Sequence, residues 1–450
     1  MLRKSQYTID VECDGYRVWI NSLTGAIDRV PPSAGAAFAD MGSDSLATLV
    51  ARGHLTDLDP EQQRFQALEA WSMMDGVHRK KAKIVICPSM DCNFRCTYCF
   101  EAPLQARIDS GQMPTRAAHM TRAQVAHIFT SFDDLLPFND SIANHITLFG
   151  GEPLWARNLD VVTDIVERAR ARSMTVSAVS NGYDLGAYRH LLGAGGIQRV
   201  QISLDGPAAI HDRMRPLKGG GANFDRIIAN IDSAKGIPGF NIDIRMNYDS
   251  GNMAHATALH ALLEEYGIIG RANVSFHANL ISMNHSGDGK DYATIKQYEA
   301  VSKTLPDAEL DCFTSGLRSN YVDALDTGAP LARRAHFCSA TSGMYVYCPD
   351  DRIYSCWEGI GEEHSWIGTF GNGPIDWRMN AVRRWHDRTA PAMPKCQTCS
   401  HLFLCGGGCA VHAIEQTGDI TVSQCDGIRK KFRYMVQKTM RERDPLQIAG

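Results

Sequence analysis

Cysteine is the residue whose spacing says most about chemistry in this chain. Eleven of the fourteen cysteines fall into three groups, and only Cys13, Cys87 and Cys312 stand apart. The groups are Cys92, Cys96 and Cys99; Cys338, Cys348 and Cys356; and Cys396, Cys399, Cys405, Cys409 and Cys425. In a long chain whose start lacks an apolar signal segment, such cysteines indicate metal ligation or catalysis rather than disulfides. Thiolates that bind the same inorganic cluster must lie close together, and close spacing in the sequence favours this.

The first group sits on one short loop, directly after a predicted strand. Its spacing is Cys92-x3-Cys96-x2-Cys99. Three thiolates on such a loop can hold three irons of a four-iron, four-sulfur cluster and leave the fourth iron open for chemistry. The alternatives are a zinc knuckle or a chance run. Structural zinc needs a fourth protein ligand, and the neighbouring sequence offers none.

The residues around this loop carry a family resemblance. Asp91–Glu101 reads DCNFRCTYCFE and resembles the signature of the radical S-adenosylmethionine (radical SAM) superfamily, including the aromatic Tyr98 before the last cysteine. Later motifs agree in order. The resemblance implies SAM contacts from Tyr98, Gly150, Gly151, Glu152, Ser180, Asn181, Ser203 and Arg215. The glycines let backbone groups approach the methionyl ammonium, while Glu152 and Arg215 supply charges opposite to its ammonium and carboxylate.

The C-terminal cysteines resemble a SPASM domain, which carries two auxiliary iron–sulfur clusters. By this resemblance Cys338, Cys348, Cys356 and Cys409 hold the nearer cluster, and Cys396, Cys399, Cys405 and Cys425 the farther one. The chain would then hold three 4Fe-4S clusters, with zinc ribbons as the rival interpretation. Two positions depart from the pattern. Asp351 replaces the usual glycine five residues before Cys356, and Trp357 stands where sulfatase-maturating enzymes place a catalytic aspartate.

The elements that must position these motifs alternate between strand and helix. The predicted strands are Ile84–Cys87, Ile146–Phe149, Thr175–Ser180, Val200–Leu204, Ile242–Asn247 and Val274–Ala278. This alternation implies parallel strands with right-handed crossovers, so the predicted class is α/β. Six repeats indicate a partial (β/α)6 barrel, with the motifs at the carboxyl ends of its strands.

Two of these strands have a polar face. Gln201, Ser203 and Asp205 share one side of the fourth strand, and Asp243, Arg245 and Asn247 share one side of the fifth. A filled barrel interior is mostly aliphatic, so polar inward faces indicate a cavity for a polar ligand. The alternative is a solvated sheet face. Asp205, Arg245 and Asn247 are the candidate contacts to substrate, and Asp205 and Arg245 the candidate catalytic residues among them.

The flanking sequence suggests four stretches. Residues 1–78 are predicted to form a small α+β domain, 79–285 the radical SAM barrel, 286–335 a linker, and 336–450 the Cys-rich SPASM domain. The first stretch resembles a peptide-recognition element, whose strand edge would take up a leader peptide by strand addition. The alternative is an inert structural extension.

Composition excludes some partners. Lys and Arg number 46 against 50 Asp and Glu, which gives a net charge of -4 and argues against a partner bound through nucleic-acid phosphates. No apolar run is long enough to span a bilayer, so a cytoplasmic location is expected.

Together the motifs predict a radical SAM maturase of a ribosomally made precursor peptide. A 5′-deoxyadenosyl radical would abstract hydrogen from a peptide residue, and a thioether, carbon–carbon or ether cross-link would follow. The expected partners are the precursor peptide and an external one-electron donor such as flavodoxin or ferredoxin. The alternatives are maturation of a folded protein, such as a sulfatase or quinoprotein, and a non-catalytic iron–sulfur electron carrier.

Overall fold

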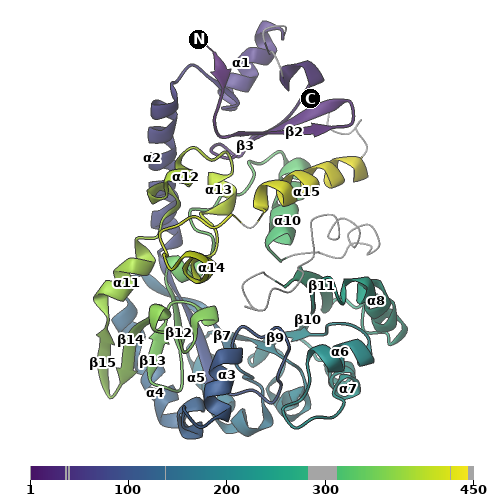
Figure 1. The fold of residues 1–450 in the computed structure, drawn as a ribbon, viewed down its shortest axis with the longest axis vertical. Coiled ribbons are helices and arrows are strands. Elements are labelled where there is room, and N and C mark those ends of the chain that lie inside the picture. Colours follow the sequence, from purple (N-terminus) through teal and green to yellow (C-terminus); the bar gives the residue numbers. More distant parts are fainter. Residues whose placement is uncertain are drawn as a thin grey trace. The chain divides into compact units, whose positions relative to one another are not determined.

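The computed structural model describes residues 2–35, 38, 41–136, 138–281, 312–425 and 427–443. The chain divides into two compact units (Figure 1). The first unit comprises Met1–His78, Phe313–Ser342 and His386–Gly450, and the second unit comprises Arg79–Cys312 and Gly343–Trp385. This grouping cuts across the four predicted stretches, whose boundaries stay a prediction. Most of the predicted linker, as far as residue 311, lies outside the described residues.

The second unit is built on a sheet that contains all six predicted strands. They are β6 (Lys81–Ser89), β7 (Ser141–Gly150), β8 (Thr175–Ser180), β9 (Ile197–Ser203), β10 (Asn241–Tyr248) and β11 (Val274–Leu280). Each pairs in parallel with the next along the chain. Within the described part of the chain β11 pairs with β10 alone, so the barrel is open. The predicted α/β class and partial (β/α)6 barrel are confirmed.

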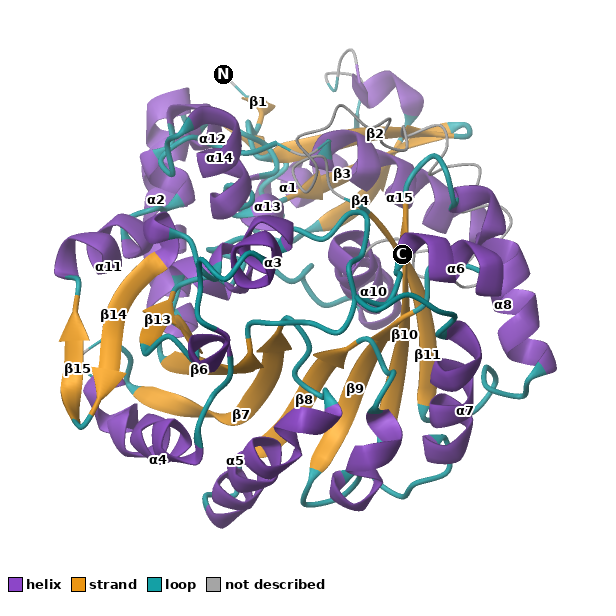
Figure 2. Cartoon of the chain, turned by 60° about the horizontal axis from the view of Figure 1, so that its bottom comes forward, coloured by secondary structure: helices purple, strands orange, loops and turns teal. Residues whose placement is uncertain are grey.

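Helices cover the outer side of this curved sheet (Figure 2). They are α4 (Arg122–Thr130), α5 (Leu159–Ala171), α7 (Phe224–Ala234) and α8 (Ala256–Glu265). The short helices α3 (Ala102–Asp109) and α6 (Ala208–Met214) come soon after β6 and β9 in the chain. In α7 the residues Phe224, Ile227 and Ile231 recur at helical spacing and are all buried, which gives the helix one apolar face for the sheet. Thr121 and Gln124 form a capping box that starts α4.

The same sheet continues beyond β6 with strands from much later in the chain. β12 (Met344–Tyr347) pairs in parallel with β6, and β13 (Arg352–Tyr354), β14 (Trp366–Gly371) and β15 (Gly373–Trp377) follow antiparallel before α11 (Met379–His386). Tyr345, Val346 and Tyr347 are fully buried, as a strand inside a sheet requires. The upstream cysteines Cys348 and Cys356 therefore follow two strands, β12 and β13, of the barrel sheet.

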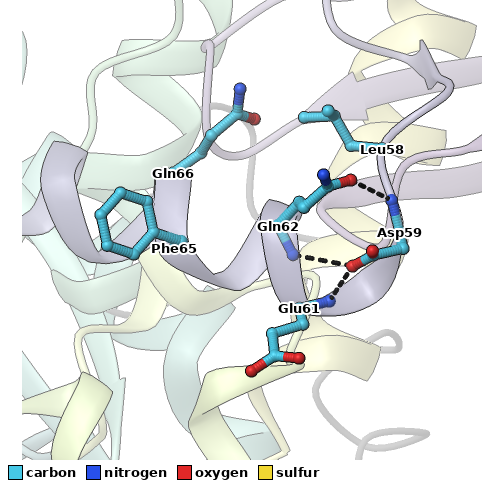
Figure 3. Close-up of a pocket in the computed structure, with 6 residues that line it drawn as sticks. All are labelled: Leu58, Asp59, Glu61, Gln62, Phe65 and Gln66. Atoms are coloured by element: carbon cyan, nitrogen blue, oxygen red, sulfur yellow. Dashed lines mark hydrogen bonds between the residues drawn. The ribbon is translucent and has the colours of Figure 1, made fainter.

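The first unit begins with the predicted small sheet. β2 (Thr8–Cys13), β3 (Tyr16–Asn21) and β4 (Ile27–Val30) are antiparallel in that order, and β1 (Arg3–Lys4) pairs with β5 (Leu55–Thr56). The helices α1 (Ser43–Ala51) and α2 (Pro60–His78) follow. Figure 3 shows the start of α2, where Asp59 accepts hydrogen bonds from the amides of Glu61 and Gln62 and so caps the helix.

This small sheet shares its core with the C-terminal part of the first unit. The elements there are α10 (Cys312–Thr327), α12 (Pro394–Gln397), α13 (Leu402–Cys405), α14 (Ala410–Thr417) and α15 (Ile428–Glu442). Ile9, Val18 and Ile20 lie in one buried cluster with Phe432 and Val436 of α15. The first unit is therefore one packed body made of three chain segments. No helix of the described ranges is long and apolar enough to cross a bilayer.

Candidate functional site

The first cysteine loop is held in place by backbone pairing with a distant segment. Phe94 is buried and bridges to Leu217, the amide of Arg95 donates to the carbonyl of Pro216 at 2.8 Å, and that of Thr97 donates to Met214 at 2.9 Å. This pairing brings residues 214–217 alongside the cysteines. Arg215 consequently lies among the thiols.

The three thiols fit a cluster with three protein ligands. The amide of Phe94 donates to Sγ of Cys92 at 3.3 Å, a contact that stabilises a thiolate. Burial raises the pKa values of Cys92 and Cys96, and positive charge on Arg215 acts in the opposite direction on Cys96. Soft sulfur donors, an amide aimed at sulfur and a buried guanidinium suit an iron–sulfur cluster better than a lone hard cation.

Four polar side chains predicted to face the site form one buried network. Arg215 donates to the hydroxyl of Tyr98 at 2.5 Å, and Tyr98 in turn donates to Oδ2 of Asp205. The side-chain amide of Asn247 reaches the same hydroxyl at 3.1 Å, and its backbone amide donates to Oδ1 of Asp205 at 2.9 Å. The polar strand faces are thus buried against one another, which argues against a solvated sheet face.

Asp205 occupies the centre of this network. It is fully buried, and burial raises the pKa of its carboxyl while the charge of Arg215, 3.7 Å away, opposes that shift. Both of its oxygens already accept hydrogen bonds, so this geometry suits holding Tyr98 and Arg215 in place. Arg245 acts on Asp205 through its charge, and its buried Nε has no hydrogen-bond partner among the residues that the structure describes. A direct contact of either residue with substrate stays a prediction.

Glu152 joins the ends of β7 and β8. Its Oε1 accepts from the hydroxyl of Ser180 at 2.7 Å and from the amide of Leu154 at 2.8 Å, and its Oε2 accepts from the amide of Asn181 at 2.7 Å. Burial raises the pKa of Glu152 to about 7, and these hydrogen bonds oppose the shift. The residues predicted to contact SAM at two strand ends are therefore brought together.

The two glycines before Glu152 serve a close backbone approach. A side chain on Gly150, whose φ is +114°, would lie 2.2 Å from Sγ of Cys87, and one on Gly151 would lie 2.3 Å from the carbonyl oxygen of Asp91. The family resemblance predicts that these glycines admit a ligand's ammonium. The contacts add another reason for them, because the end of β7 packs directly against the start of the cysteine loop.

Three half-buried aromatic rings lie beside the cysteine loop. Phe149 stacks on Trp357 with ring centroids 4.9 Å apart, and Phe100 stacks on Phe149 at 6.3 Å, both with planes 17° apart. Each ring adjoins a predicted site residue: Phe100 follows Cys99, Phe149 precedes Gly150, and Trp357 follows Cys356. The rings form a flat apolar wall within the second unit.

The four cysteines of the predicted farther cluster gather in the first unit. Burial raises the pKa of Cys396 to about 11 and that of Cys405 to about 12, and the charges of Cys399 and Cys425 act on both in the same direction. Sγ of Cys399 accepts from the amide of His401 at 3.4 Å and from Arg429 at 3.2 Å. Four converging thiols with N–H donors fit a fully ligated cluster.

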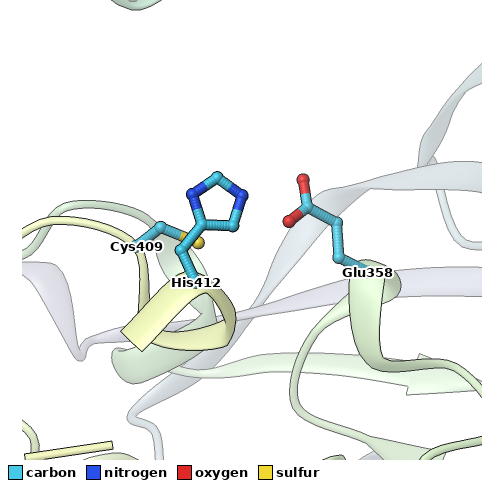
Figure 4. Close-up of side chains that lie close together, drawn as sticks. All are labelled: Glu358, Cys409 and His412. Carbon is cyan, nitrogen blue, oxygen red and sulfur yellow. The ribbon is translucent and has the colours of Figure 1, made fainter. Parts of the chain in front are cut away.

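The predicted nearer set is divided between the two units. Cys338 and Cys409 belong to the first unit, and Cys348 and Cys356 to the second. Cys409 lies at the start of α14 beside His412, one turn further on (Figure 4). Cys348 is fully buried and its thiol hydrogen-bonds to Cys87, a residue without an assigned role. This ligand set stays a prediction.

Sequence reasoning missed several polar residues around these groups. Glu101 is buried behind Cys99, where burial raises its pKa to about 8, and Arg388 and Arg429 lie among the C-terminal thiols. No pattern in the sequence marks them, because isolated Glu and Arg residues are ordinarily solvent-exposed.

Comparison with known proteins supports this geometry. The Radical SAM superfamily matches residues 86–248. The pre-heme d1 synthase of Dinoroseobacter shibae is 23% identical over 357 residues, or 73% of this chain and 81% of that protein. The probable GTP 3′,8-cyclase of Methanocella arvoryzae is 28% identical over 179 residues, covering 40% of this chain and 52% of the cyclase.

Solved structures share the fold. Native anSMEcpe with bound AdoMet superposes with a TM-score of 0.57 at 17% identity, and the match covers 80% of this chain and 97% of that one. The same protein with bound AdoMet and the Cp18Cys peptide gives 0.54 at 16% identity, over 80% and 98% of the chains. Residues 86–248, with the three-cysteine loop at the end of the first barrel strand, therefore match the Radical SAM superfamily.

Proposed function

We propose that this protein is a radical SAM maturase that installs a cross-link in a ribosomally made precursor peptide. The observation that carries the proposal is the convergence of the Cys92, Cys96 and Cys99 thiols with Arg215 at the carboxyl ends of the barrel strands. When bound, a reduced 4Fe-4S cluster and SAM together supply a 5′-deoxyadenosyl radical, which abstracts hydrogen from an unactivated C–H bond.

The chain's own residues would orient SAM. Tyr98, held by Asp205 and Arg215, offers an aromatic ring and hydroxyl beside the cysteine loop. Glu152, Ser180 and Asn181 form a hydrogen-bonded set that can receive the methionyl ammonium and the ribose. Their burial keeps water from the site, which protects a radical from side reactions.

Two features support a peptide substrate. The strands β2 and β4 each have one edge without a strand partner among the described residues, and such an edge can pair with an extended leader peptide. The wall formed by Phe100, Phe149 and Trp357 offers an apolar surface for the residue that reacts. A structurally similar protein, anSMEcpe, has been solved with both AdoMet and a peptide bound.

A cross-link removes two hydrogens from the peptide. One leaves in 5′-deoxyadenosine, and the other leaves as a proton and an electron when the new bond closes. We propose that the auxiliary clusters held by the C-terminal cysteines accept that electron. A flavodoxin or ferredoxin would donate the electron that starts the reaction. We place the reaction in the cytoplasm.

The test is anaerobic co-expression with each short reading frame that flanks the gene, followed by mass spectrometry of the peptides. The proposal expects one peptide to lose two hydrogens, and expects the Cys92→Ala variant to leave that peptide unchanged. A peptide whose mass is unchanged in ordinary water but increases through deuterium uptake in heavy water would indicate epimerisation and overturn the cross-link. A protein that makes 5′-deoxyadenosine with dithionite but alters no peptide would redirect the proposal to a folded substrate.

A further inference from the structure

Arg388 is a buried charge that the proposed function does not use. It lies in the first unit, just after α11 and before the run of C-terminal cysteines, and only 3% of its surface is exposed. Arginine is rarely buried without a carboxylate partner, because removing a charge from water is costly. Its surroundings therefore call for an explanation.

Among the described residues, backbone carbonyl groups hold the guanidinium of Arg388. Its nitrogens donate to the carbonyl oxygens of Ile420 at 2.7 Å, Gly408 at 2.9 Å, Gly407 and Val422 at 3.2 Å, and Cys409 at 3.5 Å. Within the described part of the chain no carboxylate is among these partners. The side chain ties the loop at 420–422 to the turn that delivers Cys409.

That turn needs such support. Gly406, Gly407 and Gly408 all have positive φ, and a side chain on Gly408 would lie 1.8 Å from the carbonyl oxygen of Gln424. Three consecutive glycines make a turn with little intrinsic preference for one conformation. Arg388 fixes two of these glycines through their carbonyl groups, and with them the spacing between Cys405 and Cys409.

Among the described residues, cysteines supply the leading charges that act on Arg388. Burial lowers the pKa of Arg388, while negative charge on Cys409, Cys338, Cys396 and Cys405 acts in the opposite direction. Cys409 and Cys338 belong to the predicted nearer cluster, and Cys396 and Cys405 to the farther one. One guanidinium therefore lies among thiols of both sets.

We propose that Arg388 is a positioning residue for the Gly406–Cys409 turn and the shared counter-charge of the two auxiliary clusters, raising the reduction potential of both. One-electron reduction adds one negative charge to a cluster and no atom. A nearby buried cation stabilises the reduced form more than the oxidised form. The inference depends on the clusters of the proposed function, though not on its peptide substrate.

The test compares Arg388→Gln and Arg388→Lys in the full-length protein. Both are made in a background that carries Cys92→Ala, Cys96→Ala and Cys99→Ala, so that only auxiliary clusters remain. After anaerobic reconstitution, iron and sulfide are counted, and the clusters are titrated with dithionite under electron paramagnetic resonance. Arg333→Gln is the matched control, because Arg333 lies in the same unit and donates to the carbonyl of Leu23.

The inference expects the Gln variant to shift both auxiliary potentials to more negative values, and the Lys variant to restore much of that shift. The Arg333→Gln control should leave both potentials unchanged. If Arg388→Gln keeps its full iron content and both auxiliary clusters keep their reduction potentials, Arg388 is not their counter-charge. Equal loss of iron in the Gln and Lys variants would also refute the counter-charge role. Lysine keeps the positive charge, so such a result would mean that Arg388 only holds the turn in place. If the protein with the three alanine substitutions and an unchanged Arg388 binds no iron, the auxiliary clusters of the proposed function are refuted instead.

Discussion

Glu152 gives a pH dependence that can be worked out at the scale of one residue. Burial raises its pKa from the ordinary 4.5 to about 7, so the folded protein holds this proton more tightly than the unfolded chain does. Its contribution to folding stability is therefore full below pH 4.5 and is lost as the pH rises towards 7. Binding of the SAM ammonium has the opposite preference, because it needs the ionised carboxylate.

We therefore expect SAM to bind about fivefold more weakly at pH 6 than at pH 7, in proportion to the ionised fraction of Glu152. Isothermal titration of the anaerobically reconstituted protein measures this difference. Glu152→Gln removes the titrating group and should bind SAM weakly at both pH values. Equal affinity of the unaltered protein at the two pH values would refute the role given to Glu152.

Asp351 carries backbone strain at the turn between β12 and β13. Its φ of +64° lies in the left-handed region. The SPASM domain that this segment resembles usually has glycine at this position. The hairpin forms nonetheless, with the amide of Cys348 donating to the carbonyl of Arg352 at 3.0 Å and Gln124 donating to Oδ1 of Asp351 at 2.7 Å. An aspartate therefore occupies a position that favours glycine.

Asp351→Gly and Asp351→Ala both lose the bond from Gln124, so their difference isolates the backbone conformation. We expect the glycine variant to be more stable than the alanine variant by about 1 kcal/mol. Anaerobic urea unfolding, followed by circular dichroism, gives the two free energies of unfolding. Variants of equal stability would show that the turn relaxes without strain.

At the scale of elements, the site depends on how closely the end of β7 approaches the cysteine loop. The amide of Gly151 donates to the carbonyl of Ser89 at 2.9 Å, and that of Glu152 donates to Asp91 at 3.1 Å. Gly151→Ala places a methyl group against the Asp91 carbonyl and should push the loop away. We expect the variant to lose about four iron atoms per chain, the content of one cluster.

Gly111→Ala is the control for this prediction. Gly111 has a φ of +74°, but no atom of the described residues lies within 4 Å of an added side chain. Alanine there should lower stability by about 1 kcal/mol and leave the iron content unchanged. If Gly151→Ala keeps its full iron, measured by a colorimetric assay, the close approach is not what forms the loop.

The elements of the barrel could be predicted from the sequence because strand and helix alternate and because the motifs at Cys92, Gly150 and Ser180 mark strand ends. The pairing of β12 with β6 could not. Tyr345 and Val346 indicate only a buried strand, and its partner, beginning at Lys81, lies more than 250 residues away in the chain. Such long-range pairing depends on the whole packed sheet, which no local pattern records.

At the scale of the whole molecule, residues 1–78 pack in the same hydrophobic clusters as two of the C-terminal cysteines. Ile9, Val11 and Val18 share one apolar cluster with Cys405, and Tyr7 shares another with Cys396. The sequence predicts a peptide-recognition element in this stretch, and that role stays a prediction. Its strands also supply part of the core on which the farther cysteine set rests.

Deletion of residues 1–78 should therefore remove more than leader binding. Each buried aliphatic side chain contributes about 1.5–3 kcal/mol to the free energy of unfolding. Removing the whole sheet would therefore cost more than the free energy of unfolding of an ordinary domain. We expect the truncated chain either to aggregate or to lose the iron held by Cys396, Cys399, Cys405 and Cys425.

A milder variant keeps this prediction testable if the truncated chain is insoluble. The hydroxyl of Tyr7 donates to the carbonyl of Gln397, the last residue of α12, at 2.9 Å, between Cys396 and Cys399. Tyr7→Phe removes that bond and should cost about 1 kcal/mol, whereas Tyr7→Ala also leaves a cavity and should cost about 3–5 kcal/mol. Iron loss in anaerobic urea should follow the same order. A soluble truncated chain with its full iron would mean that the N-terminal segment folds and acts as a module of its own.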